Sequence, residues 1–383
     1  MLNDVGQSTW ETVSVGSDHS CGIKSSGALY CWGSNAYGQL GIAQSDTVCG
    51  PTQAQSPCDV VPRRVQPNLS FQSVSAGAHH TCAITTGRDA YCWGANDQGQ
   101  LGTPNGGGAT AVLEPTTLGW TQISAGFSHT CGVRTDGALF CWGSNDRGQL
   151  GDGSFVGNDG MIRVPSATHI ASVATGESRT CARTTAGAVS CWGAIWTDRE
   201  NGLEITRADP SPEPVPAAPS MAWLSVGSFT TCGADLSGVA YCWEANPRGE
   251  MGDGTEEGST IPIAVSANLT FIQVTAGIVQ SCGVTESGAG YCWGDDTFGQ
   301  LGVLPTNLLE QCGGQQLYCS TTPIAVFGSQ RFTEISTGFG SHTCGVTTQG
   351  NLYCWGLGVS GQRGDGTSST AIATPTQVVD PSQ

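Results

Sequence analysis

The stretch HTCGVRTDGALFCWGSNDRGQLGDG, residues 129–153, decides the fold. Cys131 and Cys141 stand ten residues apart, on either side of a short turn that contains Gly137. A tryptophan directly follows the second cysteine, and Gly-Gln-Leu-Gly comes a few residues later. The phrase recurs along the chain, so an internal repeat has to be considered before any other architecture.

Seven copies of the phrase cover nearly all of the 383 residues. Each copy contains four short strand signals: an alternating stretch such as FQSVSAG, then HTCAIT, then AYCWG, and a strand that follows a proline. Four strands in about 50 residues are typical of one propeller blade. We therefore predict an all-β fold, a seven-bladed β-propeller of four-stranded antiparallel blades, as a single domain over residues 1–383.

The repeat is not uniform. Two insertions, near residues 42–61 and 303–322, lengthen the first and last intervals, and blade 4 has a long substitute for Gly-Gln-Leu-Gly. The order of strand signals predicts that the C-terminal strand, about residues 374–379, closes the ring beside the N-terminal strand. Abutment of two complete blades is the alternative.

The cysteine spacing predicts disulfides. In six copies a glycine stands four residues before the second cysteine, which fits a three-residue hairpin turn with a left-handed glycine. That register sets the two cysteines opposite each other, with Cα atoms about 4.5–5.5 Å apart, within disulfide range. The four other cysteines lie as pairs in the two insertions. The predicted disulfides are Cys21–Cys31, Cys49–Cys58, Cys82–Cys92, Cys131–Cys141, Cys181–Cys191, Cys232–Cys242, Cys282–Cys292, Cys312–Cys319 and Cys344–Cys354.

Zinc is the rival interpretation of the cysteines, but it needs four converging ligands, and each blade holds its pair apart from the others. We therefore predict no metal site.

Disulfides indicate an oxidising compartment: secreted, periplasmic or cell surface. The N-terminus has neither a basic start nor an apolar run. We therefore expect a mature form with an added Met1.

The charge pattern argues against two classes of partner. The net charge is −17, and Lys24 is the single lysine. Nucleic acids and anionic membranes attract clustered basic residues, and no run reaches the roughly 18 apolar residues of a membrane helix. We expect neither nucleic-acid binding nor membrane insertion; the sequence does not fix the oligomeric state.

The residues typical of catalysis form no recognisable site. His19, His80, His129 and His342 share one repeat position, where we interpret them as hydrogen-bonding groups that stabilise the turn. No nucleophile elbow, phosphate-binding loop or zinc-protease motif is found in the sequence. We predict no catalytic residue and no cofactor, and the tryptophan after each second cysteine is interpreted as a wedge between blades. An active site in the central channel is the enzyme alternative.

The combination of Val-x-x-Gly, His-Thr/Ser, Tyr-x-Trp-Gly and Gly-Gln-Leu-Gly resembles the regulator of chromosome condensation repeat proteins. The resemblance covers about residues 10–379 and implies a seven-bladed propeller. Light-sensing members carry Gly-Trp-Arg-His-Thr, whereas residues 77–81 and 126–130 here lack the Trp and the Arg. Nucleotide exchange on a small GTPase, the founding activity, fits poorly with an oxidising compartment. Some bacterial members inhibit secreted enzymes by docking on them.

Bulky apolar residues follow the repeat glycine in four blades, where small or polar residues would suffice for a turn. Exposed apolar groups of this kind can mark a binding patch; the alternative is that each folds over the rim of its own blade. The candidate partner-binding residues are Phe127, Phe229, Ile278, Val279 and Phe339.

The predicted function is a secreted or cell-surface, non-enzymatic module that docks an extracellular protein through this propeller face, with inhibition of a secreted enzyme as one subtype. The alternative is a carbohydrate-binding or adhesive surface protein that uses Trp196 and Trp223.

Overall fold

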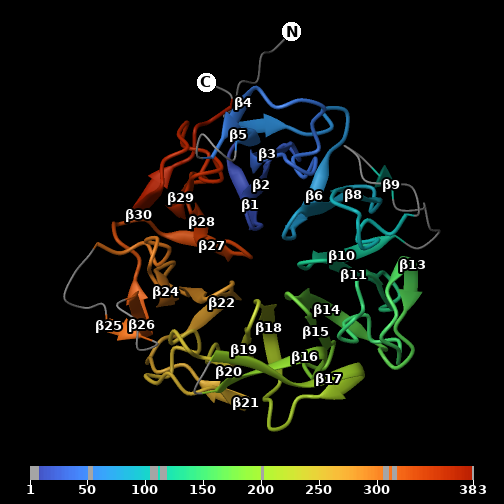
Figure 1. The fold of residues 1–383 in the computed structure, drawn as a ribbon. Coiled ribbons are helices and arrows are strands. Elements are labelled where there is room, and N and C mark those ends of the chain that lie inside the picture. Colours follow the sequence, from blue (N-terminus) through green and yellow to red (C-terminus); the bar gives the residue numbers. More distant parts are fainter. Residues whose placement is uncertain are drawn as a thin grey trace.

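The structure, a computed structural model, describes residues 8–50, 55–103, 111–112, 119–199, 202–304, 310–312 and 317–381. Seven antiparallel sheets stand in a ring around a central channel (Figure 1). The predicted seven-bladed propeller is therefore confirmed. Within the described ranges, no helix has the length and apolar character needed to cross a membrane.

Each blade runs from an inner strand beside the channel to an outer strand at the rim. The inner strands are β1 (Trp10–Val15), β6 (Phe71–Ala76), β10 (Trp120–Ala125), β14 (Ile170–Thr175), β18 (Met221–Val226), β22 (Phe271–Ala276) and β27 (Phe332–Thr337). The second strands are β2 (His19–Lys24), β7 (His80–Thr85), β11 (His129–Arg134), β15 (Arg179–Thr184), β19 (Thr230–Asp235), β23 (Gln280–Thr285) and β28 (His342–Thr347).

The third and outer strands complete the blades. The third strands are β3 (Leu29–Ser34), β8 (Ala90–Gly94), β12 (Leu139–Gly143), β16 (Val189–Arg199), β20 (Ala240–Glu244), β24 (Gly290–Asp295) and β29 (Leu352–Leu357). The outer strands are β5 (Ser56–Arg64), β9 (Ala111–Val112), β13 (Asn158–Arg163), β17 (Gly202–Pro214), β21 (Ser259–Ala264), β26 (Leu317–Ala325) and β30 (Ala371–Gln377). The two insertions add β4 (Thr47–Cys49) and β25 (Glu310–Cys312) to their blades.

The second and third strands of every blade are joined by a disulfide between directly opposed cysteines, as Cys131 and Cys141 illustrate. The Cα atoms of these seven pairs lie 4.0–4.1 Å apart, closer than the spacing expected from the register. The turn glycine is left-handed, with φ of 76° at Gly137, and in blade 2 Arg88 takes that conformation with φ of 70°. The insertions hold Cys49–Cys58 and Cys312–Cys319, so all 18 cysteines are paired as predicted.

Thiol titration checks this pairing. Denatured but unreduced protein is expected to show essentially no reaction with a thiol reagent, because every cysteine has a partner within its own hairpin. Prior reduction is expected to release 18 thiols per chain. Two or more reactive thiols before reduction would contradict the pairing.

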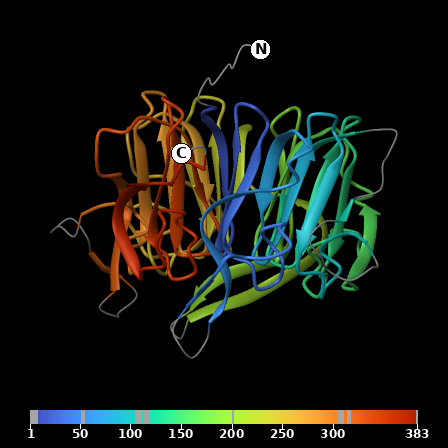
Figure 2. The same cartoon turned by 90° about the horizontal axis from the view of Figure 1, so that it is seen from above.

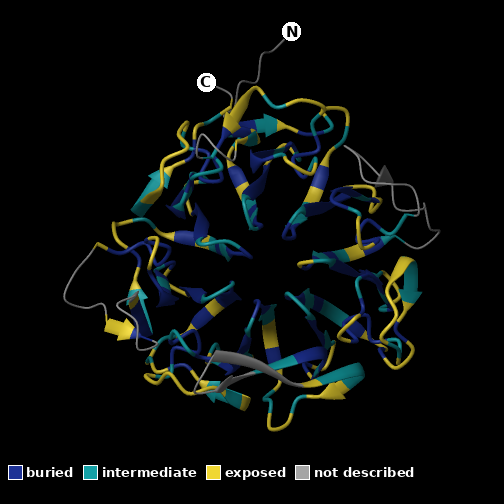
Figure 3. Cartoon of the chain, viewed as in Figure 1, coloured by how far each residue is buried: buried dark blue, intermediate teal, exposed yellow. Residues whose placement is uncertain are grey.

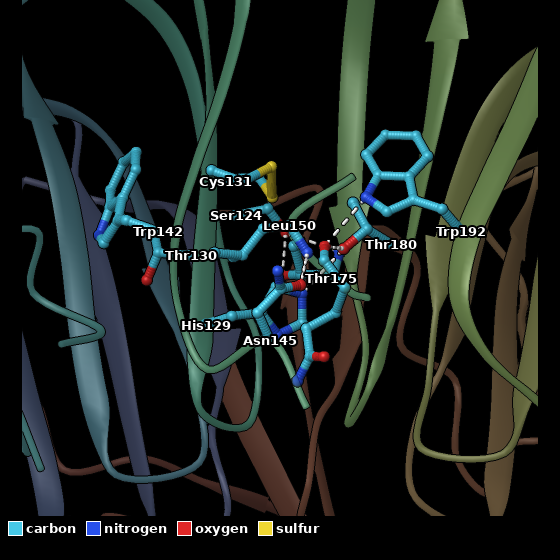
Figure 4. The surroundings of a disulfide bond; sticks show 12 residues. Ser124, His129, Thr130, Cys131, Trp142, Asn145, Leu150, Thr175, Thr180 and Trp192 are labelled. Atoms are coloured by element: carbon cyan, nitrogen blue, oxygen red, sulfur yellow. Dashed lines mark hydrogen bonds between the residues drawn. A yellow bond between two sulfur atoms is a disulfide. The ribbon is translucent and has the colours of Figure 1, made fainter. Parts of the chain in front are cut away.

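At six of the seven junctions a tryptophan of one blade donates to a loop carbonyl of the preceding blade, as Figure 4 shows for blades 3 and 4. The backbone carbonyl of Gln149, in the Gly-Gln-Leu-Gly loop of blade 3, accepts from Trp192 Nε1 (2.9 Å) and Thr180 Oγ1 (2.8 Å) of blade 4. Because Thr180 donates its one hydrogen there, it accepts from His129 Nε2 at 2.8 Å. The tryptophan is thus the predicted wedge, but the histidine bonds to the next blade instead of stabilising its own turn.

The repeat glycine is required because the blades approach closest at the channel. A Cβ atom on Gly126 would lie 2.7 Å from the carbonyl oxygen of Gly176 in the next blade, and one on Gly77 would lie 2.5 Å from that of Gly126. Such distances are shorter than any real contact of a Cβ atom. A hydroxyl two residues before the glycine adds a further bond, as Ser124 Oγ accepts from Thr175 N at 3.1 Å.

The ring closes by abutment of two complete blades, so the predicted pairing of the terminal strands is wrong. The C-terminal strand β30 pairs with β29 at the rim of blade 7, whereas β1 is the inner strand of blade 1. The chain passes from the rim of one blade to the channel side of the next at every junction, so strands that are consecutive there never share a sheet. Trp10 N still reaches Gly350 O across the closure, at 2.9 Å.

The two faces of the disc differ. The β16–β17 hairpin and the β4–β5 pair extend from one face, which is the lower one in Figure 2. The hairpin stands where the sequence lacks Gly-Gln-Leu-Gly, so the predicted difference of blade 4 is confirmed. Figure 3 shows burial concentrated within the blades, with exposed residues at the rim, on the loops and on parts of the inner strands.

Candidate functional site

The turns between inner and second strands converge at one mouth of the channel, where four rings from different blades form a continuous cluster. Tyr37 stacks on His79 with ring centroids 4.8 Å apart, and His79 meets Phe127 edge to face at 6.0 Å. Phe127 in turn contacts Phe339, from the far side of the ring, at 5.9 Å. We call these four residues the channel-mouth cluster.

Backbone hydrogen bonds around the mouth hold these turns in place. Ala78 N donates to Gly126 O, and Phe127 N donates to Gly176 O, each at 3.1 Å. The turns therefore form a belt of neighbouring loops, and Phe127 extends from this belt to contact Phe339. Tyr37 is 56% exposed and Phe127 36%, whereas Phe339 is only 9% exposed and also lines the cavity of the channel.

The five residues predicted from the sequence do not form one patch. Phe127 and Phe339 meet in the cluster, whereas Phe229 packs against Trp196 with ring centroids 5.1 Å apart. Ile278 and Val279 are half-buried on the β22–β23 turn. Phe339 fits neither sequence alternative, since it is neither an exposed group nor folded over the rim of its own blade.

Tyr37 and His79 were missed by sequence reasoning. Tyr37 lies in the Gly-Gln-Leu-Gly loop of blade 1, and His79 follows the repeat glycine of blade 2 by two residues. A usable signal was available in both cases. Aligning the seven copies picks out the rings at these loop positions, where Phe298 of blade 6 shares the position of Tyr37 and Phe229 of blade 5 shares that of His79.

The central channel holds a cavity of about 220 Å³ lined by the inner strands of all seven blades. Among the described residues that line it, Glu334 is the one ionisable side chain. Burial raises its pKa to about 7, against hydrogen bonds from the Thr12 hydroxyl and the Val13 N–H. A single carboxyl can hold a proton, but the described lining offers it no second acid or base for paired acid–base chemistry.

Trp223 and Trp196, the rings of the carbohydrate alternative, lie apart. Trp223 is 42% exposed and stands near the start of β18, at the end of the channel opposite the cluster. Trp196 contacts Phe229, which follows the other end of β18. The two rings therefore do not form a common platform for a sugar.

One group of potential metal ligands occurs within the described residues: Glu310, Cys312 and Cys319. The two cysteines are joined in a disulfide. Zinc binds the thiolate form of cysteine, so this group does not offer a zinc site.

Sequence profiles of the regulator of chromosome condensation (RCC1) repeat match residues 10–39, 71–100, 120–149 and 332–362, and a second such profile matches residues 26–84, 89–133 and 136–183. Together they span more than half of the chain. The chain belongs to the RCC1 repeat family. The RCC1 matches stop at residue 183 and resume at residue 332. The skipped stretch contains the β16–β17 hairpin and Glu244, which replaces a repeat glycine.

Other RCC1 proteins resemble the chain over different lengths. The ultraviolet-B receptor UVR8 of Arabidopsis thaliana is 30% identical over 360 residues, which are 93% of this chain and 67% of that protein. Alsin of Mus musculus is 34% identical over 89 residues, which are 23% of this chain but only 5% of alsin. The chain therefore spans only a small part of some of the RCC1 relatives it matches.

Solved structures show the same fold. Yeast RCC1 (Prp20), determined bound to Kap60, superposes with a TM-score of 0.78 at 17% identity, over 99% of this chain and 87% of that one. The ectodomain of the Arabidopsis thaliana receptor kinase ACR4 superposes with a TM-score of 0.54 at 18% identity, over 96% of this chain and 99% of that one. At these identities the similarity is one of fold alone.

Proposed function

We propose that the chain is a secreted or cell-surface, non-enzymatic module that binds an extracellular protein partner through the channel-mouth cluster. The observation that carries this proposal is the cluster itself, in which two of four contacting rings remain at least a third exposed. Aromatic residues on a rigid support lose little conformational entropy when they are buried by a partner. Inhibition of a secreted enzyme is one form that such docking takes.

The compartment is proposed from the disulfides. Nine disulfides in one chain are the usage expected of proteins from oxidising compartments. A propeller with a similar fold serves as the ectodomain of the receptor kinase ACR4, so the architecture suits an extracellular setting. A bacterial origin of this disulfide-rich member is part of the same proposal.

Variants of the two most exposed rings test the docking surface. Immobilised protein is used to capture its partner from the extracellular medium of the source, and the bound protein is identified and its affinity measured. Burying half of a large apolar side chain is worth about 1 kcal/mol or more. Tyr37→Ser and Phe127→Ser are therefore each expected to weaken binding about fivefold to tenfold.

The matched control is Leu236→Ser, since Leu236 is 76% exposed on the β19–β20 turn of the opposite face. It is expected to leave both affinity and melting temperature unchanged. Equal capture by Tyr37→Ser and the unmodified protein would reject the cluster as the docking surface. Glycan binding that depends on Trp196 or Trp223, and not on Tyr37, would favour the carbohydrate alternative.

A further inference from the structure

The junction between blades 4 and 5 lacks the loop that locks the other six junctions. In each of those six, the carbonyl of a loop residue accepts a hydrogen bond from a tryptophan of the next blade. These pairs are Gln39–Trp93, Gln100–Trp142, Gln149–Trp192, Glu250–Trp293, Gln300–Trp355 and Gln362–Trp32. Blade 4 has the β16–β17 hairpin instead. Trp243 of blade 5 is buried, and its Nε1–H has no acceptor among the described residues.

Two further substitutions occur at the same junction. Arg179 stands at the position of the repeat histidine. Glu244 stands at the position of a repeat glycine and keeps a left-handed backbone there, with φ of 86°. The two side chains form a buried ion pair, and Glu244 also accepts a hydrogen bond from Thr231 Oγ1 at 3.0 Å. Thr231 is the counterpart of Thr180, which lies in blade 4 and donates to the loop carbonyl of Gln149 in blade 3. Glu244 therefore replaces the missing loop carbonyl as the acceptor for the Thr231 hydroxyl. It does not accept a hydrogen bond from the indole of Trp243.

The missing loop also leaves space. A cavity of about 440 Å³ lies at this junction, within the range of ligand pockets, about 300–1,000 Å³. Its lining includes Trp243, Ile195, Val215 and Pro216. In blade 3 the loop residue Leu150 fills the corresponding region, where it packs in the core cluster of Trp192. Among the residues whose side chains the structure describes, the core cluster of Trp243 contains no loop leucine.

The charges of the lining indicate what kind of ligand fits. Arg179 is paired with Glu244, and Arg207 is paired with Asp209. Glu213 adds a third carboxyl to the described lining, so two basic side chains stand among three acidic ones and the cavity does not favour an anion. The buried indole N–H of Trp243 is a neutral donor without an acceptor among the described residues. A neutral carbonyl oxygen beside an apolar side chain matches both features. Five of the other six junctions provide that combination from a peptide turn, and the sixth has Arg363 in the apolar place.

We propose that this cavity binds a tight turn of a partner polypeptide, with a backbone carbonyl accepting from Trp243 Nε1–H and the following leucine-like side chain packed against the indole. The partner turn takes the place that the chain's own loop occupies at the other junctions. The site is distinct from the channel-mouth cluster, and it does not depend on the function proposed for that cluster.

The test uses a synthetic peptide with the sequence of residues 144–154 of this chain, SNDRGQLGDGS. In the fold, Asn145 shapes this turn, because its Oδ1 accepts from Leu150 N at 2.9 Å. Calorimetric titration of the whole protein is expected to show saturable binding with one site per chain and a Kd at or below about 1 mM. A peptide with Leu150→Ala is expected to bind more weakly. Absence of saturable binding at millimolar peptide would overturn the proposal.

Matched tryptophan variants locate the site. Trp243→Phe keeps a ring but removes the N–H, so it is expected to weaken the peptide about 3- to 10-fold, the worth of one neutral hydrogen bond. Trp192→Phe makes the same change where the chain's own loop is present, and it is expected to leave the affinity unchanged. Equal effects of the two variants, or none from Trp243→Phe, would overturn the assignment.

A second variant covers the case in which Trp243→Phe fails to fold. Thr260 lines the cavity and is exposed, so Thr260→Trp is expected to fill the opening without disturbing the core. Binding of the peptide by this variant with full affinity would contradict the proposal. None of these outcomes depends on Tyr37 or Phe127, so failure here is distinguishable from failure of the docking surface.

Discussion

Lowering the pH from 4.5 to 3 is expected to destabilise the propeller by about 1.4 kcal/mol per pH unit for each of four histidines. Burial lowers the pKa of His19, His80, His129 and His342 to about 3, from an ordinary value of 6.5. Between these values the unfolded chain binds a proton that the folded chain does not. The stabilisation is therefore complete above pH 6.5 and lost as the pH falls towards 3.

Three buried carboxyls shift this loss of stability to lower pH. Burial raises the pKa of Glu244, Asp296 and Glu334 to about 7. Between their ordinary pKa and 7 the folded chain holds protons that the unfolded chain has released, so these groups favour folding at low pH and lose that effect as the pH rises through 7. From pH 4.5 to 6.5 they offset most of the histidine effect, which places the steep decline below pH 4.5.

Denaturant unfolding from pH 3 to pH 7 measures the effect. His80→Gln is the sharpest variant, because blade 6 already carries Gln280 at this position, with Nε2 donating to Gly340 O at 3.1 Å. It is expected to reduce the slope below pH 4.5 by about 1.4 kcal/mol per pH unit. His169→Gln, at an exposed position, is the control and is expected to leave the slope unchanged. An unaltered slope in His80→Gln would show that the histidine does not cause the decline.

Asp380→Ala is expected to lower the free energy of unfolding by about 3 kcal/mol, because it leaves a buried cation without its partner. Lys24 Nζ lies 2.7 Å from Asp380 Oδ1, and the lysine side chain is only 3% exposed. The pair joins blade 1 to the segment that follows the last strand of blade 7. The terminal strands share no sheet, so this ion pair contributes to the stability of the closure between blades 7 and 1.

Lys24→Met distinguishes the pair from a general effect of the C-terminal segment. The lysine lies over the rings of Trp10 and Tyr30, at 5.1 and 5.8 Å from the centroids, so an apolar chain of similar length can fill the same space. It is expected to cost much less than Asp380→Ala. Arg147→Ala breaks an exposed ion pair and is expected to change stability by less than about 1 kcal/mol. Equal losses from Lys24→Met and Asp380→Ala would contradict the buried, unpaired cation as the cause of the Asp380→Ala loss.

The sequence was sufficient for features that are local in the chain. The ten-residue cysteine spacing and the left-handed turn position fix the hairpin register, and Arg88 shows that the register survives the loss of the glycine. Contacts between blades could not be predicted from the sequence. His129 bonds to Thr180, about 50 residues away, and no pattern within one repeat reveals that partner.

The candidate site was only partly predictable for the same reason. Apolar residues after the repeat glycine can be read from the sequence, but their direction depends on the curvature of the ring. That curvature brings Phe339 within contact of Phe127 across the channel, while Phe229 meets Trp196 on a hairpin that only blade 4 has. Closure failed as a prediction because strands that are neighbours in sequence were assumed to be neighbours in a sheet.

The placement of each disulfide inside one hairpin has a consequence for how the chain matures. The correct partner of Cys131 is ten residues away, whereas the nearest wrong one on its N-terminal side, Cys92, is about four times as distant. A fourfold longer loop costs roughly 1.2 kcal/mol more to close, which favours the correct thiol about eightfold before any folding occurs. A chain entering an oxidising compartment is thus expected to form the disulfide of each hairpin as soon as that hairpin enters. Little isomerase activity is then needed to correct mispaired bonds.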